Sequence, residues 1–193
     1  MIIGITGFSG SGKTTLSSQL EKILPKAKVI DVDKIHITLL IHNKKWLLDT
    51  YGENIFIDNK LNEELFMTYP EKVKTIFKLS NRELSKALKK EIEEKLKTYK
   101  YVILDSFALP RVKNIWQMCN YTILVKGIND IERYKKIKTR QEKINSKQPV
   151  DLNLRNSMSP NYNLYIYDYN IVNAYNDEFF QNIIELANDI KNI

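Results

Sequence analysis

The chain has 193 residues, of which 43% are hydrophobic and 27% are charged, a composition typical of a globular protein with one large core. The net charge is +7, but lysine outnumbers arginine 25 to 5 and the lysines are scattered among glutamates, so no nucleic-acid-binding face is indicated. No run of 18 apolar residues predicts a membrane span, and the single cysteine, Cys119, excludes an internal disulfide and is typical of the reducing cytoplasm.

The first predicted elements are a strand at residues 2–6, a glycine-rich loop and a helix. Residues 7–14 read G-x-x-x-x-G-K-T, the phosphate-binding loop of nucleotide enzymes, and apolar residues at helical spacing follow from Leu16. Glycine lets backbone N–H groups surround phosphate oxygens, which an ordinary turn would not need. Lys13 reaches the β- and γ-phosphates, and Thr14 places a hydroxyl on Mg²⁺. The predicted nucleotide-binding residues here are Gly7, Ser9, Gly10, Ser11, Gly12, Lys13, Thr14 and Thr15.

Apolar, β-branched runs then alternate with helical periodicity, the pattern of βαβ units. Further strands are predicted at residues 28–33, 101–105, 121–125 and 170–173, before a closing helix over 179–190. We therefore predict an α/β P-loop kinase fold, with a five-stranded parallel sheet flanked by helices in one domain over residues 1–193. Asp31, Asp33 and Asp105 end their strands, where ligands bind in open α/β sheets.

Two stretches interrupt this alternation. Residues 34–99 are mostly helical in pattern and are predicted to form a helical acceptor-side insert. Residues 143–165 are rich in Asn and Ser, and the region 140–160, which overlaps them, is predicted to form a lid. Arg133 and Arg140, after the fourth strand, and Arg155, in the lid, are candidates for neutralising a moving phosphoryl group. A surface ion pair is the alternative for each, and the favoured one for Arg111.

Two carboxylates have predicted chemical roles. Asp33 is the candidate general base, since it follows a core strand and precedes the insert where an acceptor would lie. Asp105 is a candidate Mg²⁺ ligand together with Thr14. The alternative for each is a structural cap, which aspartate provides well at a helix N-terminus.

Other reactive side chains favour structural interpretations. His36 and His42 lack metal-ligand spacing, and Cys119 is expected to be buried beside the fourth strand. The tyrosines at 162, 165, 167 and 169 could stack on a base, but edge-strand packing is the commoner use. A GTPase is disfavoured because no Asn/Thr-Lys-x-Asp motif is present.

Beyond the loop, several blocks resemble the dephospho-CoA kinase family. Residues 1–14 resemble its start, residues 29–35 its second-strand motif, residues 51–55 with Leu61 its insert, and residues 168–173 its last strand. The resemblance implies a phosphoryl transfer from ATP, with Mg²⁺, to the ribose 3′-hydroxyl of dephospho-CoA. In it, Asp33 would face the acceptor ribose, and Asn173 would lie near the adenine. We predict Asp33, Lys13 and Arg140 as the catalytic residues, although spacing alone does not decide which arginine reaches the phosphoryl group.

The chain departs from that family in three places. Asn81-Arg82 stands where the family has His-Pro, Ser106–Arg111 lacks the expected glutamate, and the segment from Arg140 to Arg155 is longer. A kinase of another small metabolite, such as a nucleoside or nucleotide, and a nucleotide-binding regulatory protein therefore stay open as alternatives. We expect small-molecule substrates, no nucleic acid or membrane partner, and a monomer or weak oligomer.

Overall fold

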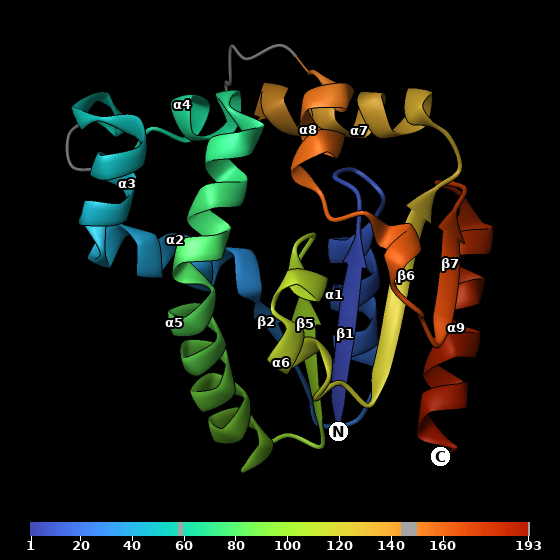
Figure 1. The fold of residues 1–193 in the computed structure, drawn as a ribbon. Coiled ribbons are helices and arrows are strands. Elements are labelled where there is room, and N and C mark those ends of the chain that lie inside the picture. The colour runs from blue at the N-terminus through green and yellow to red at the C-terminus, as the bar shows by residue number, and fades with distance from the viewer. Residues whose placement is uncertain (58–59, 144–149, 193) are drawn as a thin grey trace.

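The computed structural model describes residues 1–57, 60–143 and 150–192. Within them, a five-stranded sheet runs in the order β2-β5-β1-β6-β7, and every neighbouring pair is parallel (Figure 1). The predicted parallel sheet is thus confirmed. Its strands are β1 (Ile2–Gly7), β2 (Ala27–Asp31), β5 (Tyr101–Asp105), β6 (Tyr121–Gly127) and β7 (Tyr169–Asn173).

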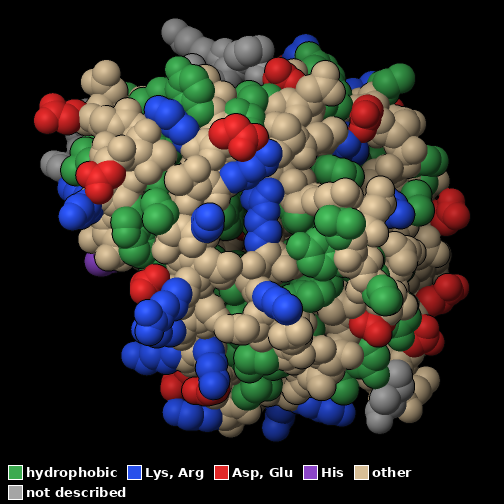
Figure 2. Space-filling view, in the orientation of Figure 1, with side chains coloured by type: hydrophobic (Ala, Val, Ile, Leu, Met, Phe, Trp, Pro, Cys, Tyr) green, Lys and Arg blue, Asp and Glu red, His purple; other side chains and the backbone are tan. Residues whose placement is uncertain are grey.

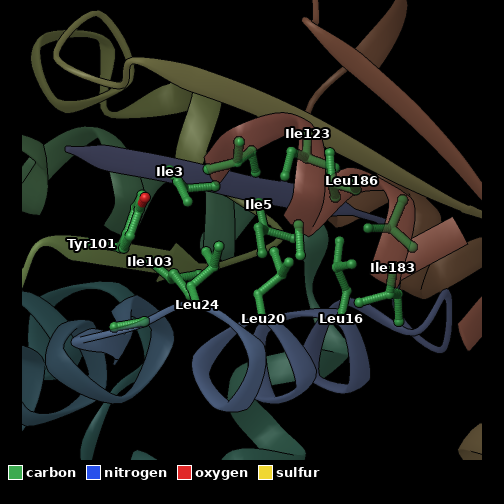
Figure 3. Close-up of a cluster of buried hydrophobic side chains, with 14 of the residues drawn as sticks. Ile3, Ile5, Leu16, Leu20, Leu24, Tyr101, Ile103, Ile123, Ile183 and Leu186 are labelled. Carbon is green, nitrogen blue, oxygen red and sulfur yellow. The ribbon is translucent and has the colours of Figure 1, made fainter. Parts of the chain in front are cut away.

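One face of the sheet is covered by α1 (Lys13–Ile23) and α9 (Asp177–Lys191). Alternate residues of a strand point to opposite faces, so Ile3 and Ile5 meet this pair of helices while Ile2 faces the other way. Figure 3 shows Ile3 and Ile5 above the apolar side of α1. Each such side chain contributes about 1.5–3 kcal/mol when it is fully buried.

The opposite face is covered by α5 (Pro70–Leu96), by η2 (Leu109–Arg111) and by α6 (Lys113–Trp116). The C-terminal half of α5 packs Leu84, Leu88 and Ile92 against β5. A helix of 27 residues is about 40 Å long, so α5 also extends past the sheet and supports the insert with its N-terminal half (Figure 1).

The insert has a core of its own. It consists of α2 (Val32–His42), α3 (Lys44–Tyr51), η1 (Glu53–Ile55) and α4 (Glu63–Thr68), with a short antiparallel pair, β3 (Phe56–Ile57) and β4 (Lys60–Leu61). Leu40, Leu47 and Ile55 are fully buried against α5. The stretch is mostly helical as predicted, and the β3–β4 pair is an addition that the sequence pattern did not indicate.

The second strand ends earlier than predicted, at Asp31 instead of residue 33. The carboxylate of Asp31 accepts a hydrogen bond from the backbone N–H of Lys34 at 2.9 Å, which caps α2 and turns the chain into a helix. Capping is therefore the role of Asp31, and the capping alternative for Asp33 is wrong.

The predicted lid region contains helix as well as loop. It begins within α7 (Asp130–Lys143) and includes α8 (Leu152–Met158), with η3 (Tyr162–Leu164) following it; its residues 144–149 lie outside the described residues. Asp151 caps α8 by accepting from the N–H of Leu154 at 2.9 Å, and Met158 packs into the core of the insert. Among the described helices, none is both long and apolar enough to cross a membrane.

Candidate active site

The phosphate-binding motif lies between β1 and α1, at the carboxyl end of the sheet (Figure 1). Two of its glycines adopt conformations that a side chain would oppose. Gly7 has a φ of 147°, and an added Cβ would collide with the carbonyl oxygen of Val125. Gly12 has a φ of 101°, and an added Cβ would collide with the side-chain amide of Asn173. The loop therefore needs glycine at both positions.

Three carbonyl groups of the loop are held from outside it. Arg133 donates to the carbonyl of Ser9 at 3.1 Å, the Tyr175 hydroxyl donates to that of Gly10 at 2.7 Å, and Asn173 donates to that of Ser11 at 3.0 Å. Each peptide N–H points away from its own carbonyl, so anchored carbonyls favour N–H groups that face the interior of the loop. The loop is thus arranged before any ligand is bound.

Lys13 is the positive centre of this site. Its Nζ donates to the carbonyl of Phe8 at 3.1 Å. Burial lowers the pKa of Lys13, the nearby Asp105 and Asp33 raise it, and Arg133 and Arg140 lower it again. Lys13 therefore stands between two carboxylates and two other cations, at the place where the motif puts the phosphates of a nucleotide.

Asp105 and Thr14 supply oxygen atoms beside Lys13. The carboxylate of Asp105 accepts a hydrogen bond from the hydroxyl of Ser17 at 3.0 Å, and the side chain of Thr14 lies close enough to help lower its pKa. Burial raises the pKa of Asp105, which Lys13 and these two hydroxyl groups oppose. A hydroxyl and a carboxylate are hard oxygen donors of the kind that Mg²⁺ uses together with substrate phosphates and water. The pair fits Mg²⁺, and the described residues hold no cluster of three His, Cys, Asp or Glu side chains.

Asp33 lies in the first turn of α2, beside the end of β5. Its carboxylate accepts a hydrogen bond from the hydroxyl of Ser106, which itself accepts from the N–H of Ala108 at 3.0 Å. Burial raises the pKa of Asp33 to about 6; Ser106 and Lys13 lower it, and Asp105 and Asp31 raise it. A carboxylate with a pKa near 6 is ionised at neutral pH yet basic enough to accept a proton.

The three arginines predicted to face a phosphoryl group are placed differently. Arg133 is buried, and its guanidinium donates to Ser9, to Asp130 at 2.6 Å and to Asn156 at 2.7 Å. It also stacks over the ring of Phe8. In this structure Arg133 therefore joins the loop to α7 and α8, and its donors are already engaged.

Arg140 and Arg155 make no ion pair or side-chain hydrogen bond with any described residue. Arg155 is half-buried, and both burial and the neighbouring charge of Arg140 lower its pKa. Arg140 thus repels both Arg155 and Lys13, and at Lys13 the carboxylates of Asp105 and Asp33 oppose this repulsion. In Figure 2, lysine and arginine side chains border a hollow between α5 and α8 near the middle of the visible face.

The histidine, cysteine and tyrosine side chains for which a structural role was favoured are mostly buried or packed against other residues. His36 is buried, hydrogen-bonded to Ser80 at 2.6 Å, and burial lowers its pKa to about 4. Burial also raises the pKa of Cys119 to about 12, so its thiol is inert. Tyr165 and Tyr167 pack edge-on against Trp116, as the packing alternative predicted.

Sequence reasoning missed residues that hold these groups in place. Ser106, Ser17 and Tyr175 position Asp33, Asp105 and the loop respectively. Ser106 could have been found, since it directly follows the carboxyl end of a buried strand. Nothing in the local pattern distinguishes Ser17 or Tyr175 from ordinary helix and turn residues.

This fold and this site define a class of protein, the P-loop kinases, which are ATP-dependent phosphotransferases. Residues 2–167 match the phosphoribulokinase / uridine kinase family over most of the chain, and the protein belongs to that family.

Two curated relatives agree with the resemblance seen in the sequence. A dephospho-CoA kinase domain-containing protein of Danio rerio is 28% identical over 134 residues, or 64% of this chain and 57% of the relative. The dephospho-CoA kinase of Dehalococcoides mccartyi is 30% identical over 100 residues, or 48% of this chain and 50% of the relative. The matches thus extend over about half the length of these relatives.

Solved structures share the whole fold. The Thermus thermophilus protein TT1252 has a TM-score of 0.70 at 19% identity and covers 96% of this chain and 95% of its own. The dephospho-CoA kinase of Campylobacter jejuni has a TM-score of 0.55 at 15% identity, with 98% and 96% covered. At such identities the likeness shows the fold, and the acceptor has to be argued from the site.

Proposed function

We propose that the protein transfers the γ-phosphoryl group of ATP to the ribose 3′-hydroxyl of dephospho-CoA, giving CoA and ADP. The observation that carries phosphoryl transfer is the meeting of Lys13, Asp33 and Asp105 at one end of the sheet. These three charges are close enough to shift one another's pKa values. They would provide a cation for the phosphates, a carboxylate for the metal and a carboxylate for the acceptor. These are the groups that the reaction requires.

On the nucleotide side, the loop would enclose the phosphates, and Lys13 would turn from the carbonyl of Phe8 to a phosphate oxygen. Arg140 and Arg155 would close on the transferred group, since a bound polyphosphate would relieve the repulsion among the three cations. Mg²⁺ held by Thr14 and Asp105 would supply charge neutralisation at the phosphates.

On the acceptor side, Asp33 would orient the acceptor hydroxyl and receive its proton. Ser106 donates to one carboxylate oxygen, Oδ1, which leaves the other for the acceptor. The oxygen of the acceptor then forms a bond to the γ-phosphorus as the bond to the β-phosphate oxygen breaks, and ADP leaves.

The identity of the acceptor is supported by the sequence blocks around Asp33 and the insert, and by the names of the two curated relatives. The test is mass spectrometry of the products formed from ATP, Mg²⁺ and dephospho-CoA, with the Lys13→Ala variant as the control. CoA and ADP should appear together and vanish in the control. ADP without CoA would reject dephospho-CoA as the acceptor.

A second candidate is phosphorylation of a nucleoside, because the matching family includes the uridine kinases. This reaction would use the same phosphate-binding loop and the same base, Asp33. It would differ only in the acceptor that the insert binds. Uridine in place of dephospho-CoA in the same assay distinguishes the two, since only one of the acceptors should gain the phosphoryl group.

A further inference from the structure

Arg111 is a cation that the mechanism above does not use. It ends η2, just after β5, and is half-buried, with its Nη1 atom enclosed and without a hydrogen-bond partner among the described residues. The guanidinium lies over the ring of Phe77, 5.5 Å from its centre. The predicted surface ion pair of Arg111 is absent within the described part of the chain. A buried, unpaired N–H group is costly, so a ligand that accepts a hydrogen bond from it would be bound favourably.

The surroundings of Arg111 are rich in aromatic side chains. Burial lowers the pKa of its guanidinium, and the side chains that oppose this shift are Tyr162 and Tyr165. Arginine pKa values lie so far above neutrality that the group stays charged. A positive charge beside aromatic rings, with no carboxylate paired to it among the described residues, is suited to an anion brought by a ligand.

The position of Arg111 is on the acceptor side of the site. Phe107 directly follows Ser106, the partner of Asp33, and its ring packs edge-on against Phe77 at 5.9 Å. Tyr162 is electrostatically coupled to both Asp33 and Arg111. Asp33 and Arg111 therefore flank the same aromatic group, formed by Phe77, Phe107 and Tyr162, on the insert side of the loop.

The backbone of Arg111 is fixed from the insert. The side-chain amide of Asn81, on α5, donates to the carbonyl of Arg111 at 3.0 Å. Asn81 and Arg111 belong to two segments that depart from the dephospho-CoA kinase pattern, and the structure brings them into contact. The two departures are thus in contact, and Asn81 holds the backbone from which the Arg111 side chain extends.

We propose that Arg111 binds an anionic phosphate or pyrophosphate group of the acceptor and thereby selects phosphorylated acceptors over neutral ones. This proposal rests on the proposed phosphoryl transfer, but the binding of an anion by Arg111 can be tested without turnover. Arg111 is a specificity residue in this proposal, and the proton transfer stays with Asp33.

The binding test uses the whole chain loaded with Mg²⁺ and the non-hydrolysable ATP analogue AMP-PNP, so that the phosphate-binding loop is filled. Inorganic pyrophosphate is then titrated calorimetrically into the wild-type protein, Arg111→Gln and Arg82→Gln, an exposed control that loses the same charge from α5. Arg111→Gln should weaken binding on the order of 10- to 100-fold, and Arg82→Gln should bind as the wild type does. Equal affinities for the two variants, or no binding by the wild type, would overturn the proposal.

A second readout separates ligand binding from a structural role. Because the enclosed Nη1 has no partner, Arg111→Met should raise the melting temperature of the ligand-free protein. A structural arginine would lower it on removal, and that result together with unchanged pyrophosphate affinity would reject the proposal. If the wild type makes CoA, Arg111→Gln should raise the KM for dephospho-CoA and leave the KM for ATP unchanged. If it makes no CoA, the proposed acceptor fails while the pyrophosphate titration still decides on Arg111.

Discussion

The phosphate-binding loop and the acceptor side meet at Lys13 and Asp33, but they are held in different ways. The loop is eight residues of one segment, and its carbonyl groups are anchored by β7, the turn after it and α7. The proposed acceptor side is made of single side chains from α2, α5, η2 and η3, and the enclosed Nη1 of Arg111 there has no hydrogen-bond partner among the described residues. A preorganised loop suits a ligand common to the whole class, whereas scattered side chains can change with the acceptor.

The largest effect is expected on the nucleotide side, from Lys13→Ala. Its charge serves the phosphates in the ground state and in the transition state, so turnover should fall by about 10³-fold or more. Steady-state assays measure this, with Lys22→Ala, an exposed lysine of α1, as the control. If Lys13→Ala kept a tenth of the wild-type rate, Lys13 would not have the central role in stabilising the transferred phosphoryl group that is proposed for it.

Asp33→Asn tests the point where the two sides meet. It should lower kcat by on the order of 10²-fold or more and leave the KM for ATP nearly unchanged, because only the base is lost. Asp31→Asn is the control, since asparagine still caps α2. Similar kcat values for the two variants would remove Asp33 from the mechanism.

The pH dependence follows from the same carboxyl group. Wild-type kcat/KM should rise as the pH increases through about 6, where Asp33 of the free protein ionises, and Asp33→Asn should lose this step. The pKa is raised above its ordinary value of 3.8, so the folded state binds this proton more tightly than the unfolded chain and loses stability as the pH rises through about 6. Thermal melts at two pH values check this. The melting temperature of Asp33→Asn relative to the wild type should be higher above pH 6 than it is below pH 3.8.

The arginines provide a contrast within the lid region. Arg133→Gln should lower the free energy of unfolding by about 2–3 kcal/mol, since buried donors and their partners are separated. Arg155→Gln should leave the melting temperature unchanged or higher and lower kcat by roughly 10- to 100-fold, because its cation is unpaired until a phosphoryl group arrives. Denaturant unfolding and kinetics of both variants check this, and equal loss of stability would contradict the division of roles.

The smallest effect is expected from Ser106→Ala. Its hydroxyl lowers the pKa of Asp33, so the variant should shift the midpoint of the kcat/KM–pH profile upward and lose roughly threefold in kcat/KM at pH 7. A pH–rate profile of the variant measures the shift. An unchanged midpoint would mean that this hydrogen bond does not tune the base.

Local sequence was enough to predict the sheet, the loop and the carboxylates at its edge, because each depends on a short pattern of residues. The strand runs are apolar on both faces, and the motif over residues 7–14 has one geometry. The sequence could not show that Asp31 caps α2 in place of Asp33, since both are acidic and two residues apart. The sequence also could not show that Arg133 supports the loop, because this depends on its contact with Asn156. Nor could it show that Arg111 lies over Phe77 without an ion pair among the described residues. Such long-range contacts leave no local periodicity.

The most direct test of the account compares the kcat/KM of the wild-type protein for dephospho-CoA and for uridine, with ATP and Mg²⁺ saturating. Dephospho-CoA carries the pyrophosphate that the acceptor side is proposed to bind, and uridine carries no phosphate. The account predicts that kcat/KM for dephospho-CoA exceeds that for uridine by on the order of 10²-fold or more. A higher kcat/KM for uridine would contradict it, and would assign this site to a nucleoside.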